Sequence, residues 1–379
     1  MSMPSTFLRR CELALRFPAF VWTIRSLAGL VASGLRKARR GLALAAIGVL
    51  LLLAPVLAQV TAPAPVAAPS ASSELGIAEW LTRLHGASRQ RTYIGTFVVS
   101  AGANMSSAKI WHVCNGDLQM ERVESLSGQP RSTFRRNEQV VTFLPASRIV
   151  VAETRESLGL FPDLLRTTDV SLGQLYSVHQ IGVERVAGLD ADVVQLQPRD
   201  RLRFGYRIWS ERATGLVVKL QTLDVDGRVL EQAAFSELQM DAPVSVAKLT
   251  QMMENTEGYR VDKPEMLKTT AAAEGWAMKN PVAGFKPMSC HKRPPSASDG
   301  SKSDGALQWV FSDGLASVSV FVQAFDPRRH VLEGATTLGA TQTLTRRLKE
   351  KTGDWWLTVI GEAPQSTLAA FSLGLERTR

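Results

Sequence analysis

The sequence predicts an α+β protein in which an antiparallel sheet curls over one helix as a half-barrel and a smaller α+β domain follows. Residues 77–84 carry apolar side chains at helical spacing, and most segments of residues 91–240 alternate apolar and polar side chains as strands do. A second group of strand-like segments begins at Trp276. A chain of 379 residues is too long for one small core and fits two domains.

Residues 1–58 are predicted to be a leader that ends in a secretory signal peptide. Residues 36–58 read RKARRGLALAAIGVLLLLAPVLA, a basic stub followed by an uncharged apolar run and a small-residue exit. The run is near the lower limit of about 17 residues for a membrane-spanning helix, and Pro55 favours cleavage after Ala58 over a lasting anchor. We therefore expect an exported protein. We interpret residues 1–35 as the result of a start codon that was assigned too far upstream.

The leader also accounts for most of the chain's basicity. It holds eight of the 44 Lys and Arg but only one of the 35 Asp and Glu, in a chain whose formal net charge is +9. A strongly basic chain would suggest nucleic acid as a partner. Because the mature chain is nearly neutral, we expect no nucleic acid.

A flexible tether and one amphipathic helix are expected to open the mature chain. Residues 59–73 consist largely of Pro, Ala and Ser. A capping residue and a first-turn acid follow at Ser73–Glu74, which predicts a helix start and the beginning of a first domain over residues 74–240. The apolar residues spaced along one face of this helix are Ile77, Trp80, Leu81 and Leu84.

The helix is followed by segments typical of an antiparallel meander. They are short, rich in Val, Ile, Thr and aromatic residues, and separated by Gly, Pro and Asn. An apolar and partly helical interruption at residues 156–176 divides them. The segments before it are 91–100, 107–116, 117–126, 138–145 and 148–153, and those after it begin with 180–188 and 190–198.

Residues 199–238 give the clearest strand pattern of the chain. The sequence ERATG is expected to turn one strand into the next, and Asp226–Gly227 to turn that strand into a third. In the first strand one set of side chains is apolar and the alternate set is mostly basic. The apolar set is Leu202, Phe204, Tyr206 and Ile208, and the alternate set is Arg201, Arg203, Gly205 and Arg207.

A half-barrel of this kind encloses an apolar hollow, a common place for a lipid-like ligand. The same residues could equally be an ordinary core, and periodicity cannot separate the two interpretations. Cations beside the hollow suggest an anionic amphiphile, although a solvated charged face is the simpler account of any single Arg. The acyl-chain candidates are Phe97, Val99, Leu202, Phe204, Tyr206, Ile208, Val218 and Leu220, and the headgroup candidates are Arg201, Arg203 and Arg207.

The remainder of the chain is expected to be a linker and a second domain. Residues 241–270 are polar and loosely helical, which favours a linker. From residue 271 to 379 we expect an α+β domain whose closing helix begins at Pro364, because the fixed φ of proline suits a first helical position. A basic cluster in this domain includes Arg346 and Arg347.

Signals for catalysis or metal binding are weak. The phosphate-binding glycine loops, the G-x-S-x-G elbow and the H-E-x-x-H motif are absent from the sequence. His112 with Cys114, and Cys290 with His291, could supply four ligands, but neither pair has the C-x-x-C spacing of a zinc site. We expect no enzyme, no metal and no cofactor. We also expect Cys114 and Cys290 to be separate thiols, because a disulfide would join what we interpret as two domains.

The chain resembles the RseB/MucB family of periplasmic regulators of the sigma-E type envelope stress response. The resemblance rests on blocks that run in family order over nearly all of residues 75–375. The most specific block is RFGYRIW followed by GRVLEQ. The other blocks include YIGTFVV, KIWHVCNGDLQMERVESLSG, AGFKPMS, FSDGLASVSVFV and LGATQTLTRRLKEKTGDWWLTVIGEAP.

This resemblance implies a LolA-like half-barrel, a linker and a smaller C-terminal domain in the periplasm. It implies a regulator that binds the periplasmic region of a membrane-spanning anti-sigma factor and shields it from regulated proteolysis. Acyl chains of lipopolysaccharide or lipoprotein in the hollow would release that partner. Partner contact is expected mainly in the C-terminal domain, where Arg346 and Arg347 are the candidates. Self-association stays open. The alternative is a periplasmic lipid or lipoprotein carrier, although a carrier needs no second domain.

Overall fold

The computed structural model describes residues 77–154, 161, 172–264, 266–293, 305–350 and 353–378. The leader and the tether predicted for residues 1–73 therefore lie outside the described residues, as does most of the interruption predicted at residues 156–176. Within the part of the chain that is described, no helix is both long and apolar enough to cross a membrane.

The predicted amphipathic helix is present as α1 (Ile77–Gln90), whose start lies at the limit of the described residues. Trp80, Leu81 and Leu84 are buried, as is Ala87 one turn later. The 3.6-residue period places all four on one side of the helix. This side packs into the core of the first sheet, where α1 contacts β2 (Asn104–Asn115) and β10 (Val217–Leu223).

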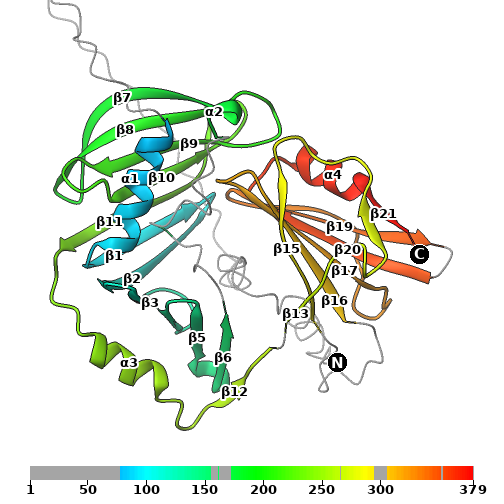
Figure 1. Ribbon diagram of the computed structural model, residues 1–379, viewed down its shortest axis with the longest axis horizontal. Helices are drawn as coiled ribbons and strands as arrows, with labels where there is room; N and C mark the ends of the chain where they lie inside the picture. The colour runs from blue at the N-terminus through cyan, green and yellow to red at the C-terminus, as the bar shows by residue number, and fades with distance from the viewer. Residues whose placement is uncertain are drawn as a thin grey trace, which may run out of the picture. The chain divides into compact units, whose positions relative to one another are not determined.

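The first sheet has twelve strands, and they follow one another around a curve from β7 to β12 (Figure 1). Their order is β12-β6-β5-β4-β3-β2-β1-β11-β10-β9-β8-β7. Most neighbours in the sheet are therefore also neighbours in sequence, as expected of a meander. The remaining bounds are β1 (Tyr93–Ala101), β3 (Leu118–Ser125), β4 (Ser132–Arg136), β5 (Gln139–Leu144), β6 (Ile149–Thr154), β7 (Tyr176–Val186), β8 (Leu189–Pro198), β9 (Gly205–Glu211), β11 (Val229–Met240) and β12 (Arg260–Asp262).

Rows of side chains across the sheet define two faces. Ile208, Leu220, Ala233 and Val99 lie opposite one another on four successive strands and pack in the same apolar cluster. We call this side the inner face. The adjacent row, shifted by one residue on each strand, is polar and belongs to the outer face, since successive side chains of a strand point to opposite sides. It runs through Gln195, Arg207, Gln221, Gln232 and Ser100.

The two turns predicted within residues 199–238 form as expected. Glu211 to Gly215 joins β9 to β10, with the Gly215 N–H donating to the Glu211 carbonyl oxygen at 2.7 Å. Asp224 organises the next turn, because its side chain accepts from the Asp226 N–H at 2.9 Å. Gly227 there has φ +82°, a left-handed conformation that glycine adopts without strain.

Residues 241–270, predicted as a linker, contain structure that belongs to the first sheet. Helix α3 (Val246–Glu254) buries Leu249 and Met253 against a second apolar cluster that includes Phe134 and Phe143. Strand β12 then pairs in parallel with β6. The polar composition obscured this packing, because α3 buries only one narrow stripe and β12 is an exposed edge strand.

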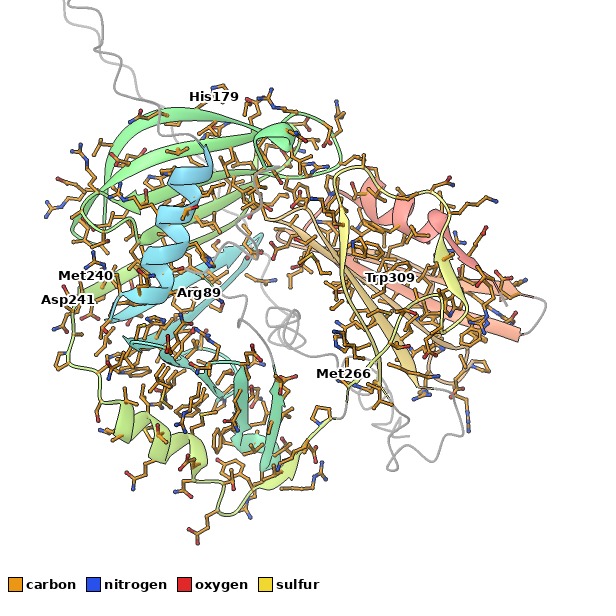
Figure 2. The ribbon with its side chains drawn as sticks, viewed as in Figure 1. Arg89, His179, Met240, Asp241, Met266 and Trp309 are labelled. Carbon is orange, nitrogen blue, oxygen red and sulfur yellow. The ribbon has the colours of Figure 1, made fainter. Side chains whose placement is uncertain are left out.

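The second sheet has seven strands in the order β13-β15-β16-β17-β20-β19-β18. Helix α4 (Gln365–Gly374) packs on it with Leu368 and Phe371 fully buried, and Pro364 stands at its N-cap, one residue before the first helical position that the sequence predicted for it. Figure 2 draws the side chains of this part, among them Trp309. The strands are β13 (Leu267–Lys268), β15 (Lys286–Arg293), β16 (Ala306–Ser312), β17 (Ser317–Ala324), β18 (Gly334–Leu338), β19 (Thr341–Glu350) and β20 (Gly353–Gly361), with a separate pair β14 (Trp276–Met278) and β21 (Leu375–Arg377).

These elements confirm the predicted fold class. An N-terminal antiparallel sheet carries one long helix on its apolar core, and a smaller sheet with a closing helix follows in the chain. Cys114 and Cys290 are both free thiols, as expected.

Candidate functional site

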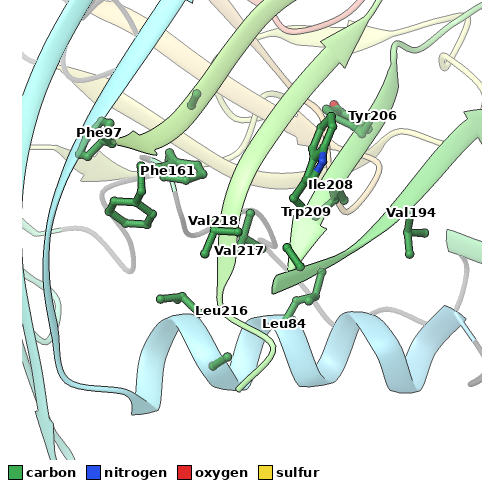
Figure 3. Close-up of a cluster of buried hydrophobic side chains, with 14 of the residues drawn as sticks. Leu84, Phe97, Phe161, Val194, Tyr206, Ile208, Trp209, Leu216, Val217 and Val218 are labelled. Carbon is green, nitrogen blue, oxygen red and sulfur yellow. The ribbon is translucent and has the colours of Figure 1, made fainter. Parts of the chain in front are cut away.

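The inner face brings together most of the residues predicted to line a hollow. Phe97, Tyr206, Ile208 and Val218 are buried in the main core cluster, and Val99 and Leu220 pack against its margin with part of their surface accessible. Figure 3 shows Phe97, Ile208 and Val218 among the buried side chains of this cluster. The observed cluster is compatible both with a core and with an acyl-binding face.

Sequence reasoning missed one aromatic side chain of this face. Phe161 packs against Phe97 with ring centroids 5.6 Å apart and against Phe235 at 5.0 Å, and it is itself buried (Figure 3). Phe97 and Phe235 also contact each other, with ring centroids 6.2 Å apart. The surrounding segment was predicted only as an apolar and partly helical interruption, and this pattern does not indicate that this one ring reaches the inner face.

Two of the predicted hollow residues lie elsewhere. Leu202 packs against the core cluster of the second sheet, and Phe204 is buried but is not part of the inner-face cluster. Both residues lie outside the strand, because β9 begins only at Gly205. Residues 201–204 precede the strand, so strand alternation does not govern where their side chains point.

The basic row predicted at Arg201, Arg203 and Arg207 does not form. Arg201 is exposed, Arg203 is completely buried, and Arg207 lies on the outer face, where its guanidinium donates to the Gln195 side-chain oxygen at 3.3 Å. The sheet separates Arg207 from the inner face. These three cations are therefore not placed to hold one headgroup beside an acyl chain on the inner face.

Arg203 instead belongs to a buried polar cluster that joins residues of the two sheets. Its Nη1 donates to Asp313 Oδ2 at 3.1 Å, its Nη2 to the Ala283 carbonyl oxygen at 2.9 Å, and its Nε to Asp200 Oδ1 at 3.0 Å. The Tyr176 hydroxyl also donates to Asp313 Oδ2, at 3.1 Å. We call Arg203, Asp313 and Tyr176 the Arg203 cluster.

Burial dominates the electrostatics of this cluster. It raises the pKa of Asp313 above its usual value, although Arg203 and the N–H groups of Leu315 and Ala316 act in the opposite direction. Burial likewise raises the pKa of Tyr176 well above its usual value, which keeps the hydroxyl protonated as a donor. The guanidinium stacks over the Phe285 ring at 5.3 Å. The cluster is consequently a fully enclosed ion pair rather than an exposed anion site.

Apolar side chains exchange across the same contact. Leu202, next to Arg203, packs against the core of the second sheet, while Leu315, next to the Asp313 turn, packs against the core of the first. Thr367 of α4 donates its hydroxyl to the Leu202 carbonyl oxygen at 2.7 Å. Tyr176 and the inner-face residue Tyr206 lie with ring centroids 6.2 Å apart. The inner face therefore continues directly into this contact.

The partner-binding candidates lie on opposite faces of β19. Arg346 is opposite the buried Leu357, on the side of the sheet that faces the core, whereas Arg347 pairs with Asp354. The guanidinium of Arg347 also lies over the Phe325 ring at 4.1 Å. Adjacent residues of one strand cannot share a face, so the two cations do not form one patch.

Among the described residues, no three His, Cys, Asp or Glu side chains gather as metal ligands. His112 Nδ1 lies 2.6 Å from the Arg91 carbonyl oxygen, and its ring stacks on Tyr93. Burial raises the pKa of the Cys290 thiol to about 11. A shallow polar depression at the β7–β8 and β9–β10 turns, lined by Arg185, Asp190 and Arg212, does not include the inner-face residues.

Family comparison matches both halves of the chain. Residues 76–253 match the MucB/RseB N-terminal domain, and residues 270–376 match the MucB/RseB C-terminal domain. The chain is 29% identical over 299 residues to the sigma factor AlgU regulatory protein MucB of Pseudomonas aeruginosa, covering 78% of this chain and 90% of that relative. It is 22% identical over 290 residues to the sigma-E factor regulatory protein RseB of Escherichia coli K12, covering 76% and 86%.

Solved structures give the same correspondence. MucB in complex with MucA(peri) matches with a TM-score of 0.60 and 26% identity, over 79% of this chain and 98% of that one. The Pseudomonas aeruginosa MucA/MucB complex matches with a TM-score of 0.61 and 26% identity, over 80% and 99%. The match extends over both sheets.

Proposed function

The chain belongs to the MucB/RseB family, and from this premise we propose that it is an exported regulator of an envelope stress sigma factor. In this proposal it binds the periplasmic region of a membrane-spanning anti-sigma factor and shields that region from regulated proteolysis. Acyl chains of lipopolysaccharide or lipoprotein bind at the inner face and weaken the hold on the anti-sigma factor.

The observation that carries the proposal is the match of two consecutive family domains over nearly all described residues. If only the N-terminal sheet matched a known family, the second sheet would have no proposed role. The solved relatives that match both sheets include MucB bound to MucA. This supports a protein partner of the same kind for this chain.

Apolar surface at the inner face supports the acyl part of the proposal. Val99 and Leu220 keep part of their surface accessible at the margin of a cluster that also holds Phe97 and Ile208. A bound acyl chain would cover this margin, and burial of apolar area is favourable by about 25 cal/mol per Å². Release of the partner then requires a difference in ligand affinity between the two conformations. About 2–3 kcal/mol of coupling, or some 30- to 150-fold, would make a working switch.

For partner contact we propose Arg347 ahead of Arg346. Arg347 lies on the face of β19 that is turned away from the core, where the ring of Phe325 and the carboxylate of Asp354 hold it in place. An arginine fixed in this way loses little entropy when it meets a carboxylate of a partner. Arg346, the preceding residue of the same strand, lies on the core-facing side and is not placed to meet a partner in this way.

A titration tests the regulator. The mature chain, residues 59–379, is titrated calorimetrically with the periplasmic region of the single-span anti-sigma factor from the same organism. We expect saturable one-to-one binding and slower cleavage of that region by the protease that begins its regulated proteolysis. Addition of lipid A or of a triacylated lipopeptide should weaken binding, whereas their deacylated forms should not. Absence of any binding to the anti-sigma region would refute the proposal.

The acyl site has its own test. Val99→Asp and Leu220→Asp place a charge at the accessible margin of the inner face, and Val98→Asp places the same charge one residue away on the outer face of β1. Binding of a fluorescent fatty acyl probe should fall at least tenfold for the first two variants and change little for the third. Equal loss in all three, or none, would remove the inner face as the acyl site.

A further inference from the structure

A second contact between the two sheets is made by the turn between β18 and β19. Gly339 in this turn has φ +57° and sits so close to the ends of β1 and β11 that an added Cβ would lie 2.6 Å from the Cβ of Ala101 and 2.6 Å from Glu231 Oε2. The Ala340 N–H donates to Glu231 Oε2 at 3.3 Å. The approach is possible because glycine offers no side chain and tolerates this conformation.

Within the described part of the chain, no cation acts on Glu231 to balance its charge where it meets this turn. The second sheet presents Gly339, the Ala340 N–H and the carboxylate of Glu362, while the neighbouring strands of its own sheet present Ala101 and Thr222. Burial and then the repulsion by Glu362 raise the pKa of Glu231 to about 7 from an ordinary value of 4.5. The single long hydrogen bond from Ala340 offsets only part of this.

We propose that Glu231 and the β18–β19 turn form a proton-dependent clamp between the two sheets, which closes when Glu231 is protonated and loosens when it is ionised. A neutral carboxyl group is buried at small cost, can still accept from Ala340, and does not repel Glu362. An ionised carboxylate gains solvation when the turn moves away. The clamp goes beyond the proposed function, since it requires no anti-sigma factor and no lipid.

The direction follows from linkage between protonation and contact. With the turn away from it, Glu231 would titrate near its ordinary value, and in the closed clamp it titrates at a higher pH. Closure is therefore favoured fully below the lower value, and the advantage is lost as pH rises through the higher one. The two values limit the effect to about 300-fold in the closure equilibrium, and between pH 5.5 and 7.5 they give about 20-fold.

Hydrogen exchange of the mature chain measures closure directly. The Ala340 amide is bonded to Glu231 in the closed clamp, so its protection against exchange reports closure. After correction for the intrinsic rate, we expect its protection to fall about 20-fold from pH 5.5 to 7.5. The Gly227 amide, bonded to the Asp224 carbonyl oxygen within its own turn, is the internal reference and should not change. Protection of Ala340 that is equal at both pH values would overturn the proposal.

Two variants identify the group that titrates. Glu231→Gln resembles the protonated form, so protection of Ala340 should stay high and lose its pH dependence. Glu362→Gln removes the repulsion and should move the midpoint to lower pH. A carbon-13 titration of Glu231 gives a second readout, with a midpoint near 7 in the parent protein and nearer 4.5 in Gly339→Ala, where the turn cannot approach. A parent midpoint near 4.5, or pH dependence that survives in Glu231→Gln, would refute the clamp.

Discussion

The ion pair of Arg203 and Asp313 allows a sharp test of how the two sheets hold together. Both side chains are completely inaccessible to solvent. Loss of one partner from a buried pair costs about 3–5 kcal/mol, mostly because the other charge stays buried alone. The two positions are not equivalent, because Asp313 also accepts from the Tyr176 hydroxyl and from the N–H groups of Leu315 and Ala316.

We therefore expect Asp313→Ala to cost about 4–5 kcal/mol, since it leaves three donors without their acceptor and leaves Arg203 with only the partly exposed Asp200 as a counter-charge. Arg203→Met should cost about 3 kcal/mol, because Asp313 keeps its three donors and can also take up a proton. The double variant should cost little more than Asp313→Ala, which gives a coupling energy of about 2–3 kcal/mol. Tyr176→Phe, which removes one hydroxyl donor, should cost about 1 kcal/mol.

Urea unfolding of the mature chain, followed by tryptophan fluorescence, measures these differences. The Arg203→Met penalty should also shrink in acid, because burial raises the pKa of Asp313 and its protonated form needs no counter-charge. Above that pKa the full penalty should return. Additive single costs, or an Arg203→Met cost below about 1 kcal/mol, would show that Arg203 and Asp313 do not act as a buried, coupled pair.

Three further predictions concern other sites. Burial, with a smaller effect of Arg329, lowers the pKa of His330 to about 4. The contribution of the neutral His330 side chain to stability should therefore be complete above pH 6.5 and be lost as pH falls toward 4. The urea unfolding midpoint of His330→Gln should lack this pH dependence. Arg377→Met removes a guanidinium that lies over Trp276 at 4.9 Å and over Trp355 at 4.8 Å, and it should cost about 1–2 kcal/mol in urea unfolding. Phe161→Ala should cost about 3 kcal/mol and tighten binding of a fatty acyl probe, because the ring no longer fills the space that it occupies against Phe97 and Phe235. Unchanged binding would argue against an acyl site there.

Local pattern predicted the elements that local forces determine. The spacing of Trp80, Leu81 and Leu84 indicated a helix, and Asp226–Gly227 indicated a turn, and both are confirmed. Pro364 indicated a helix start, and α4 begins one residue after it. Alternation within β9 also placed Ile208 and Arg207 on opposite faces, as observed.

Long-range contacts were beyond the reach of pattern. Arg203 finds Asp313 110 residues further along the chain, and nothing near either residue indicates the other. The predicted alternation of β9 side chains began four residues too early, at Arg201, because the sequence shows no break before the strand starts at Gly205. Residues 241–270 were predicted as a linker for another reason. Strand β12 within them forms by pairing with β6, and its own polar composition does not indicate that pairing.

The exchange of Leu202 and Leu315 between the two cores bears on how the protein can be divided. A fragment that ends after α3 would present Leu202 to water and leave the Arg203 guanidinium without Asp313, while the complementary fragment would expose Leu315 beside an unpaired carboxylate. Each fragment would then expose an apolar side chain beside an unpaired charge at the surface that the other fragment covers. Such fragments are expected to aggregate, or to reassociate when they are co-expressed, so the two sheets are best regarded as one folding unit.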